Sequence, residues 1–290
     1  MSIINALPAS EPTVAYLGPR GTFSEEIALS FYRGVEGCFT PYERIDAVIR
    51  AVADGEAAEG IVPVENSLDG SVNITLDTLA HEVDLRVVKE MVLPIRHNLL
   101  ARADTKHINV ILSHPQALAQ CRNYLREHYP GAELVAVEST AAAAYQVASG
   151  AKNTAAIGSL RAARLYNLAV PAVDIQDNPN NSTRFIVLAR DAAAPAGPNC
   201  KTSVICQING EKPGSLYEIL GEFARRQVNL TKIESRPART GLGLYIFFLD
   251  AEGSLEDGNV RAAVEAVRER SIWFKSLGSY PICLVKHKAE

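Results

Sequence analysis

Five short polar clusters carry residue types that could bind and convert a small anionic molecule. Four of them follow an apolar, strand-like segment and precede a helix-like segment, at residues 18–26, 64–71, 113–117 and 138–142. In open α/β sheets, ligands bind at the carboxyl ends of strands, because the loops there converge on a crevice. The clusters are rich in hydroxyl and amide groups, and helix starts add unpaired N–H groups. The pattern therefore predicts an anion-binding crevice.

The first two clusters each allow a functional and a purely structural interpretation. In GPRGTFSEE, Thr22 and Glu25 fit the capping box S/T-x-x-E, and the helix start presents a positive dipole end to an anion. An ordinary capped helix explains the same two residues. In VENSLDGS, Glu65, Asn66 and Ser67 place a carboxylate and several donors directly after the apolar IVPV. Local turn hydrogen bonds are the alternative there.

The third and fourth clusters mark two further helix starts. In SHPQA, Pro115 suits the first turn of a helix, so His114 and Gln116 would flank its N-terminus. In ESTAA, Ser139 and Thr140 stand where the next helix begins. Helix capping is the alternative to ligand binding for both hydroxyls. Each of these clusters is a weak signal when taken alone.

The fifth cluster, DNPNNSTRF (177–185), precedes the apolar strand FIVLAR. If that strand lies in the sheet, Asn181, Thr183 and Arg184 enter the mouth of the crevice, although a turn-rich loop is the alternative. The sequence shows no Ser-His-Asp order, no Walker loop and no G-x-G-x-x-G. A site of this kind can catalyse a reaction for which orientation and hydrogen bonding to a leaving oxygen suffice.

The elements that position these clusters are repeated strand–turn–helix units. Such units predict an α/β architecture with a mostly parallel sheet. Two long apolar segments, 85–102 and 182–190, interrupt the alternation, as crossover strands of a two-lobed domain would. The strand-like segments of the regular units are 13–18, 58–65, 108–114, 132–140 and 153–159.

The last third of the chain follows a different order. Leu216, Ile219, Leu220 and Phe223 mark one helix face, and Val260, Val264 and Val267 mark a second. With strands at 202–209, 229–238, 244–251 and 273–285, the order is βαββαβ, the ferredoxin-like arrangement. DAAAPAGPN (191–199) reads as a linker. We therefore expect a first domain at 12–190, a linker at 191–199 and a second domain at 200–287.

Composition excludes several classes of protein. With 29 basic against 33 acidic residues, the 290-residue chain has a net charge of −4, which argues against nucleic-acid binding. It has no apolar run of the roughly 18–20 residues that span a membrane, and its start lacks the features of a secretory signal. No metal-ligand spacing occurs. We expect a cytoplasmic protein without metal or cofactor, whose scattered thiols are free: Cys38, Cys121, Cys200, Cys206 and Cys283.

The ordered motifs together resemble a known family. GPRGTFSEEIA, PVENSLDGSV, SHPQALAQC, STAAAA, AAIGS and NSTRF occur in the order found in prephenate dehydratases. GSLYEIL (214–220) and NLTKIESRP (229–237) resemble an ACT regulatory domain. The resemblance covers residues 12 to about 285. It implies a periplasmic-binding-protein-like catalytic domain with two α/β lobes, followed by a ferredoxin-like ACT domain.

The resemblance implies a decarboxylating dehydration of prephenate to phenylpyruvate, carbon dioxide and water, without a cofactor. Aromatisation of the substrate ring drives this reaction, so the protein need only fix the geometry and help the hydroxyl depart. Arogenate dehydratase, whose substrate differs by an amino group, is an open alternative. A two-lobed amino-acid sensor without turnover is another, although the TRF segment argues against it.

The resemblance also assigns residues. It makes Thr183 the catalytic residue, which would hydrogen-bond the departing oxygen. Arg184 could bind a carboxylate or brace its loop, and strand alternation favours bracing. Phe185 borders the site and also suits a packing role. The resemblance places these residues in the substrate pocket: Thr22, Ser24, Asn66, Ser67, Gly70, Ser139, Thr140, Asn181, Arg184 and Phe185, with Glu65, His114 and Gln116 as weaker candidates.

For the ACT-like part, the resemblance implies feedback inhibition by L-phenylalanine bound at an interface between chains of a homodimer or homotetramer. The turn-to-helix start would take the amino acid's carboxylate on backbone N–H groups. A strand of the partner chain would complete the site. Ser215 departs from the alanine common in this motif. The implied effector residues are Gly214, Ser215 and Leu216, with Glu234, Ser235, Arg236 and Pro237.

Overall fold

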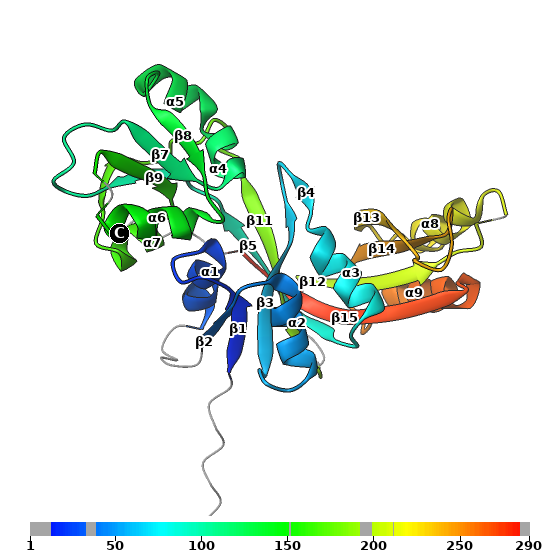
Figure 1. The fold of residues 1–290 in the computed structure, drawn as a ribbon. Coiled ribbons are helices and arrows are strands. Elements are labelled where there is room, and N and C mark those ends of the chain that lie inside the picture. The colour runs from blue at the N-terminus through cyan, green and yellow to red at the C-terminus, as the bar shows by residue number, and fades with distance from the viewer. Residues whose placement is uncertain (1–12, 33–38, 151, 192–198, 211, 285–290) are drawn as a thin grey trace, which may run out of the picture.

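The computed structural model of the chain describes residues 13–32, 39–150, 152–191, 199–210 and 212–284, and these residues form two α/β lobes and a C-terminal unit (Figure 1). One lobe holds a five-stranded sheet, and the other shares a ten-stranded sheet with the C-terminal unit. This confirms the predicted α/β architecture with two lobes and a smaller module.

The first lobe is built around a mixed sheet, which corrects the prediction of a mostly parallel one: the return strand runs antiparallel to both of its neighbours. Its strands run in the order β5-β11-β3-β1-β2, with β1 parallel to β2 and β3, and β11 antiparallel to both β3 and β5. Three helices connect these strands. The elements are β1 (Val14–Leu17), α1 (Phe23–Phe31), β2 (Phe39–Tyr42), α2 (Ile45–Ala53), β3 (Glu59–Asn66), β4 (Gly70–Ser71), α3 (Asn73–His81), β5 (Arg86–Pro94) and β11 (Ser182–Ala189).

The second lobe has its own sheet, in the order β10-β6-β9-β7-β8. The helix predicted to begin at Pro115 is followed directly by a second one, because the backbone leaves the helical region at Cys121 (φ −113°, ψ 14°). The elements are β6 (Asn98–Ala101), β7 (Val110–Ser113), α4 (Pro115–Gln120), α5 (Arg122–His128), β8 (Glu133–Ala136), α6 (Thr140–Ala148), β9 (Thr154–Gly158), α7 (Leu160–Leu165) and β10 (Ala169–Ala172).

Two connections cross between the lobes. The long apolar segment at 85–102 is two strands, β5 in the first lobe and β6 in the second, separated by residues 95–97. The chain returns between β10 and β11. The segments that broke the strand–helix alternation are therefore the crossover segments, as predicted. They place residues 95–97 and 173–181 at the junction, next to the predicted site.

The C-terminal unit has the predicted βαββαβ order. Its four strands are antiparallel, in the order β13-β14-β12-β15. The predicted helix faces meet in one core, where Ile219 and Phe223 pack with Val260, Val264 and Val267. The elements are β12 (Cys200–Gln207), α8 (Ser215–Arg225), β13 (Leu230–Pro237), β14 (Tyr245–Glu252), α9 (Gly258–Arg270) and β15 (Trp273–Leu284).

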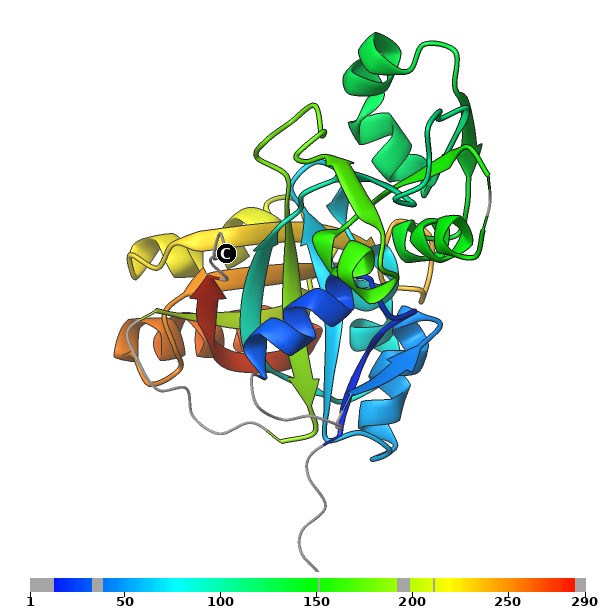
Figure 2. The same cartoon turned by 90° about the vertical axis from the view of Figure 1, so that its left-hand side faces the viewer.

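The two parts of the chain are joined more closely than the sequence predicts. The end of β15 leaves the C-terminal unit and pairs in parallel with β5, with Ile282 opposite Glu90 and Leu284 opposite Val92 (Figure 2). One sheet therefore runs through the first lobe and the C-terminal unit. Most of the predicted linker, residues 192–198, lies outside the described residues, and the boundaries 12–190, 191–199 and 200–287 stay predictions.

Cys121, Cys200 and Cys206 are buried and form no disulfide, whereas Cys38 lies outside the described residues. Burial raises the pKa of Cys121 to about 12 and that of Cys206 to about 11, so both thiols stay protonated and unreactive at neutral pH. Within the part of the chain that the structure describes, no helix is long and apolar enough to cross a bilayer.

Candidate active site

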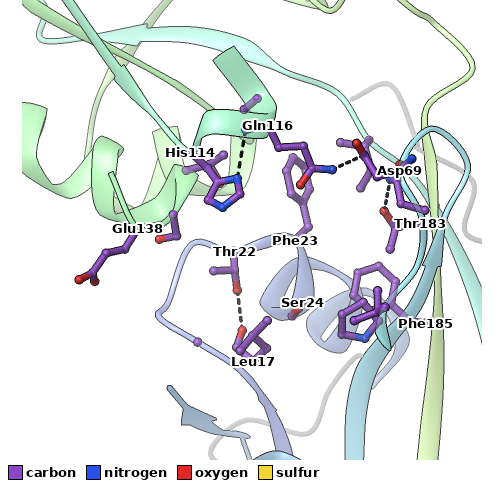
Figure 3. A pocket seen from close by; sticks show the side chains of 18 of the residues that line it. Leu17, Thr22, Phe23, Ser24, Asp69, His114, Gln116, Glu138, Thr183 and Phe185 are labelled. Atoms are coloured by element: carbon purple, nitrogen blue, oxygen red, sulfur yellow. Dashed lines mark hydrogen bonds between the residues drawn. The ribbon is translucent and has the colours of Figure 1, made fainter. Parts of the chain in front are cut away.

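A cleft of about 1210 Å³ lies between the two lobes, where the polar clusters meet (Figure 3). Segments from both lobes and from the return crossover line it. Eleven of the predicted residues are among those that line the cleft: Thr22, Ser24, Asn66, Gly70, His114, Gln116, Ser139, Thr140, Asn181, Thr183 and Phe185. Their placement is the one expected from strand ends that converge on a crevice.

The first-lobe side of the cleft begins at helix α1. The Thr22 hydroxyl accepts the Glu25 N–H (3.3 Å) and donates to the Leu17 carbonyl (2.9 Å), which confirms the N-cap. Glu25 in turn accepts the Gly21 N–H (2.8 Å) and pairs with Arg161 of the second lobe (3.0 Å). The Thr22 hydroxyl therefore donates and accepts its hydrogen bonds within the protein. A ligand anion can instead meet the N–H groups of the first helical turn.

The second lobe contributes two further helix starts. His114 caps α4, and its Nδ1 accepts the Gln116 N–H (3.3 Å). Ser139 caps α6, and its hydroxyl accepts the Ala142 N–H (3.0 Å). Both side chains therefore make the capping bonds of the structural interpretation while they line the cleft. Because α1 and α6 both begin at the cleft, their positive dipole ends favour an anion there.

Thr183 lies in the cleft with its hydroxyl held by a neighbouring strand. Asn66 Nδ2 donates to Thr183 Oγ1 (2.9 Å) and to Asn181 Oδ1 (2.9 Å). The Asn66 amide can face Thr183 only through its NH₂ group, because its Oδ1 accepts the backbone N–H of Leu68 (2.9 Å) and of Asp69 (3.2 Å). Thr183 Oγ1 is therefore an acceptor from Asn66, and its own proton remains available for a ligand.

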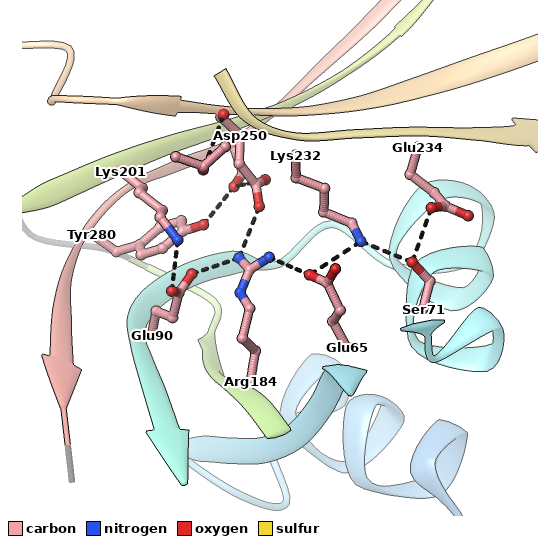
Figure 4. A network of polar contacts seen from close by, with 11 residues as sticks. Glu65, Ser71, Glu90, Arg184, Lys201, Lys232, Glu234, Asp250 and Tyr280 are labelled. Atoms are coloured by element: carbon pink, nitrogen blue, oxygen red, sulfur yellow. Dashed lines mark hydrogen bonds and ion pairs between the residues drawn. The ribbon is translucent and has the colours of Figure 1, made fainter. Parts of the chain in front are cut away.

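The predicted pocket residues Arg184 and Glu65 are not among the residues that line the cleft. In the register of β11 on β3, Thr183 lies opposite Asn66 and Arg184 lies opposite Glu65, so successive side chains point to opposite faces of the sheet. Arg184 bonds Glu65 (2.6 Å) and Glu90 (2.6 Å). It also reaches Asp250 (2.8 Å) in the C-terminal unit (Figure 4). The bracing role is the one that the structure supports.

The charged network around Arg184 changes the ionisation of its members. Burial alone would lower the pKa of Arg184, but Asp250 and Glu90 outweigh it and raise that pKa above its ordinary value. For Glu65, burial alone would raise the pKa, but the charges of Lys232 and Arg184 outweigh burial and lower that pKa below the ordinary range. The network therefore stabilises the fold most when the Glu65 carboxylate is ionised.

This network predicts an acid-sensitive contribution to stability. A carboxyl of an unfolded chain titrates at about 4.3. The contribution of Glu65 is complete above that pH and is lost as the pH falls through its lower folded-state pKa. The difference in unfolding free energy between the parent and Glu65→Gln should therefore shrink as the pH falls, measured by urea unfolding at several pH values. A difference that is constant with pH would contradict this.

Ser67, also predicted to line the pocket, makes contacts within the protein instead. Its hydroxyl donates to the Asn180 carbonyl (3.1 Å) and accepts the Ser182 N–H (3.0 Å), so it ties the end of β3 to the return crossover. It is not among the residues that line the cleft. Phe185 lines the cleft and also packs in the first-lobe core, where it is 2% exposed. The hydrogen bonds of Ser67 fit the local turn bonds that are the alternative for VENSLDGS, and the burial of Phe185 fits its packing role.

Sequence reasoning missed several cleft residues, among them Asp69, His97 and Gln120. A signal for one of them was present. Gln120 follows Gln116 by four residues, which places both on one face of a helix. Asp69 stands within the VENSLDGS cluster but was not singled out, and His97 lies in the crossover that joins β5 to β6. Their role depends on the contact between the lobes, which no local pattern shows.

Comparison with known proteins identifies the family of this site. The family model of prephenate dehydratase matches residues 14–193, and that of the ACT domain matches residues 203–269. The chain belongs to the prephenate dehydratase family. This confirms the resemblance seen in the ordered motifs, and the structural unit at the C-terminus is an ACT domain.

Relatives of this prephenate dehydratase family member match most of its length. A bifunctional chorismate mutase/prephenate dehydratase of Pseudomonas aeruginosa is 44% identical over 92% of this chain and 73% of the relative. A prephenate dehydratase of Methanocaldococcus jannaschii is 39% identical over 93% of this chain and 98% of the relative. The crystal structure of an Arthrobacter aurescens prephenate dehydratase in complex with L-Phe is 38% identical, with a TM-score of 0.84 over 93% of this chain and 90% of that one.

The predicted effector residues lie on two elements of the ACT domain. Gly214 precedes α8 with a φ of +89°, and Ser215 and Leu216 begin the helix. Glu234, Ser235, Arg236 and Pro237 end the edge strand β13. Glu234 accepts the Ser71 hydroxyl (3.0 Å), and Arg236 pairs with Asp77 of α3 (3.0 Å). Strand β13 therefore contacts the first lobe of its own chain beside β4.

Proposed function

We propose that the chain catalyses the decarboxylating dehydration of prephenate to phenylpyruvate, carbon dioxide and water. The observation that carries the proposal is the hydrogen bond from Asn66 to Thr183 Oγ1 (2.9 Å), because it leaves the threonine proton free inside the cleft. The membership of the chain in the prephenate dehydratase family supports the same reaction.

The reaction needs a donor at the leaving oxygen and little else. As the bond between the ring and its carboxylate breaks, carbon dioxide departs and the electron pair enters the ring. The C–O bond to the hydroxyl then breaks with its electron pair, and one proton taken up overall completes the water molecule. A hydrogen bond from Thr183 stabilises the charge that develops on the departing oxygen. Helix starts at α1 and α6 offer N–H groups for the substrate carboxylates.

The test compares two substrates. Purified protein is mixed with prephenate, and phenylpyruvate is followed by its absorbance in alkali; arogenate is offered in parallel, and phenylalanine is quantified. We expect the larger kcat/KM with prephenate. A larger value with arogenate would assign the arogenate dehydratase alternative. Binding of prephenate without product above the uncatalysed background would identify a sensor instead of an enzyme.

We further propose that L-phenylalanine inhibits the enzyme through the ACT domain. Three observations support this: the ACT family match, the start of α8, where the N-cap residue Gly214 offers no side-chain capping bond, and the contact of β13 with the catalytic part at Ser71. Inhibition follows if phenylalanine binds a less active arrangement more tightly than the active one. The Arthrobacter aurescens relative was crystallised with L-Phe, which is consistent with this ligand.

Gly214→Ala tests the effector site. Its φ of +89° strains any residue with a Cβ, while no atom lies within 4 Å of the added methyl group, so the change acts on the backbone of the turn. We expect the half-inhibitory concentration of phenylalanine to rise about tenfold, the effect of roughly 1.4 kcal/mol, with unchanged activity in its absence. Initial rates against phenylalanine concentration measure this.

Gly258→Ala is the matched control, because it begins helix α9 of the same domain with equally open space and without a positive φ. It should leave the inhibition curve of the parent unchanged. If Gly214→Ala and the parent gave the same inhibition curve with phenylalanine, the start of α8 would not be part of the effector site.

We also propose a cytoplasmic homodimer or homotetramer in which β13 of one chain approaches α8 of another. Apolar side chains of the ACT domain are exposed on these elements, with Tyr217 78% and Ile233 50% accessible. Buried free thiols fit a reducing compartment. Light scattering of the purified protein checks the assembly, and a monomer in the presence of phenylalanine would contradict it.

A further inference from the structure

Asp69 closes a ring of hydrogen bonds at the back of the cleft. Asn66 Nδ2 donates to Asn181 Oδ1 (2.9 Å), and Asn181 Nδ2 donates to Gln120 Oε1 (2.9 Å). Gln120 Nε2 then donates to Asp69 Oδ2 (3.0 Å), and the Asp69 N–H donates to Asn66 Oδ1 (3.2 Å). Each of the four residues donates to the next, so the ring runs in one direction. Thr183 is attached to it through Asn66.

The carboxylate of Asp69 fixes the orientation of the Gln120 amide and, through it, that of the Asn181 amide. An ionised carboxylate only accepts hydrogen bonds, so Gln120 must present its NH₂ group to Asp69 and its Oε1 to Asn181. Asn181 must then present its NH₂ group to Gln120 and its Oδ1 to Asn66. Asn66 receives its orientation from the hairpin backbone, because its Oδ1 accepts the N–H groups of Leu68 and Asp69, and its NH₂ group therefore meets both Asn181 Oδ1 and Thr183 Oγ1. Asp69 does not contact Thr183 and acts on it through three amides.

The ring also joins the two lobes. Asn66 and Asp69 belong to the β3–β4 hairpin of the first lobe, Gln120 ends α4 of the second lobe, and Asn181 lies in the return crossover. Gln116, one turn earlier on α4, donates to the same Asp69 oxygen (Figure 3). The ring is therefore complete only when α4 lies against the hairpin, as it does here.

We propose that Asp69 is a positioning residue for the dehydration, which orients the Thr183 hydroxyl when the lobes approach each other. The inference rests on the proposed function. An acidic side chain beside a site for a dianion weakens substrate binding by charge repulsion. Asp69 therefore contributes through the orientation that it imposes on the Thr183 hydroxyl. Its removal should lower kcat, because the threonine proton matters most as the C–O bond breaks, and should lower KM as well, because the repulsive charge is gone.

The experiment compares Asp69→Ala with Asp69→Asn by steady-state kinetics with prephenate. Asp69→Ala loses the acceptor and should lower kcat about tenfold, while Asp69→Asn keeps an Oδ1 acceptor for Gln120 and should retain kcat within about threefold. Asp69 is exposed on a hairpin, so both variants should fold, which thermal unfolding checks. A merely structural role would not separate these two variants.

A double-mutant cycle extends the test to the ring. Asp69→Ala and Gln120→Leu each break the same ring, so the double variant should be scarcely slower than either single variant. Gln146 is an exposed residue of α6 in the same lobe as Gln120. Gln146→Leu is therefore the matched control and should keep the parent kcat.

Three results would overturn the inference. They are a parent-like kcat for Asp69→Ala, an equal loss of kcat in Asp69→Asn, and multiplicative effects of Asp69→Ala and Gln120→Leu. A parent protein that converts no prephenate would instead refute the proposed function itself. The two failures are therefore distinguishable.

Discussion

Replacement of Thr183 by valine should lower kcat for prephenate by about 10²- to 10⁴-fold, the range expected for loss of a group that assists proton transfer to a leaving oxygen. Valine keeps the β-branched shape of threonine in strand β11 and removes only the hydroxyl. Thr183 is 9% exposed, and its Oγ1 accepts from Asn66, so its proton is directed to the cleft. Steady-state rates and the calorimetric dissociation constant of prephenate measure the effect.

The fold and the binding of substrate should survive this change. Thr183→Ser keeps a hydroxyl and should retain part of the rate. Thr40→Val, on the exposed strand β2, is the matched control for a threonine in a strand and should equal the parent. If Thr183→Val stayed within about threefold of the parent kcat, the role assigned to the hydroxyl would be wrong.

Replacement of Arg184 by methionine should lower the free energy of unfolding by about 3–5 kcal/mol, the cost of removing one partner from a buried ion pair. Glu90 is 1% exposed and Asp250 is 9% exposed, so both carboxylates would lose a cation away from water. Glu90 would keep its ion pair with Lys201 (2.7 Å). Urea unfolding followed by circular dichroism measures the loss.

An exposed arginine provides the matched control for this prediction. Arg50→Met removes the partner of Glu82 on the surface of α2, where water replaces the lost contact, and its unfolding midpoint should stay close to that of the parent. Equal stability of Arg184→Met and the parent would show that the network contributes nothing. A chain cut at 191 should also be destabilised, because it loses Asp250 and Lys201 together.

The fold was predictable where one element carries its own pattern. The βαββαβ order and the repeated strand–helix units follow from apolar periodicity, and the structure confirms them. The pairing of β15 with β5 was not predictable, because a strand does not show which sheet its far end joins. Helix α2 was not predicted although IDAVIRAVA is amphipathic, because none of the polar clusters lies on it.

The site was predictable as far as strand ends and helix starts locate side chains. Thr183, Asn66 and Ser139 line the cleft because each stands at such a position. Arg184 could be separated from Thr183 only by strand alternation, and the ion pairs that hold it come from three other strands. The contact of Asp69 with Gln120 depends on how the lobes meet, which no local pattern specifies.

The most direct test of the proposed activity is the stoichiometry of products from prephenate at neutral pH. Phenylpyruvate is quantified by its absorbance in alkali and carbon dioxide by a coupled carboxylation assay, with Thr183→Val as the blank. The site described here predicts equal amounts of both products, formed by the parent far faster than by the variant. Prephenate that stays bound and unconverted, or equal rates for the parent and Thr183→Val, would contradict it.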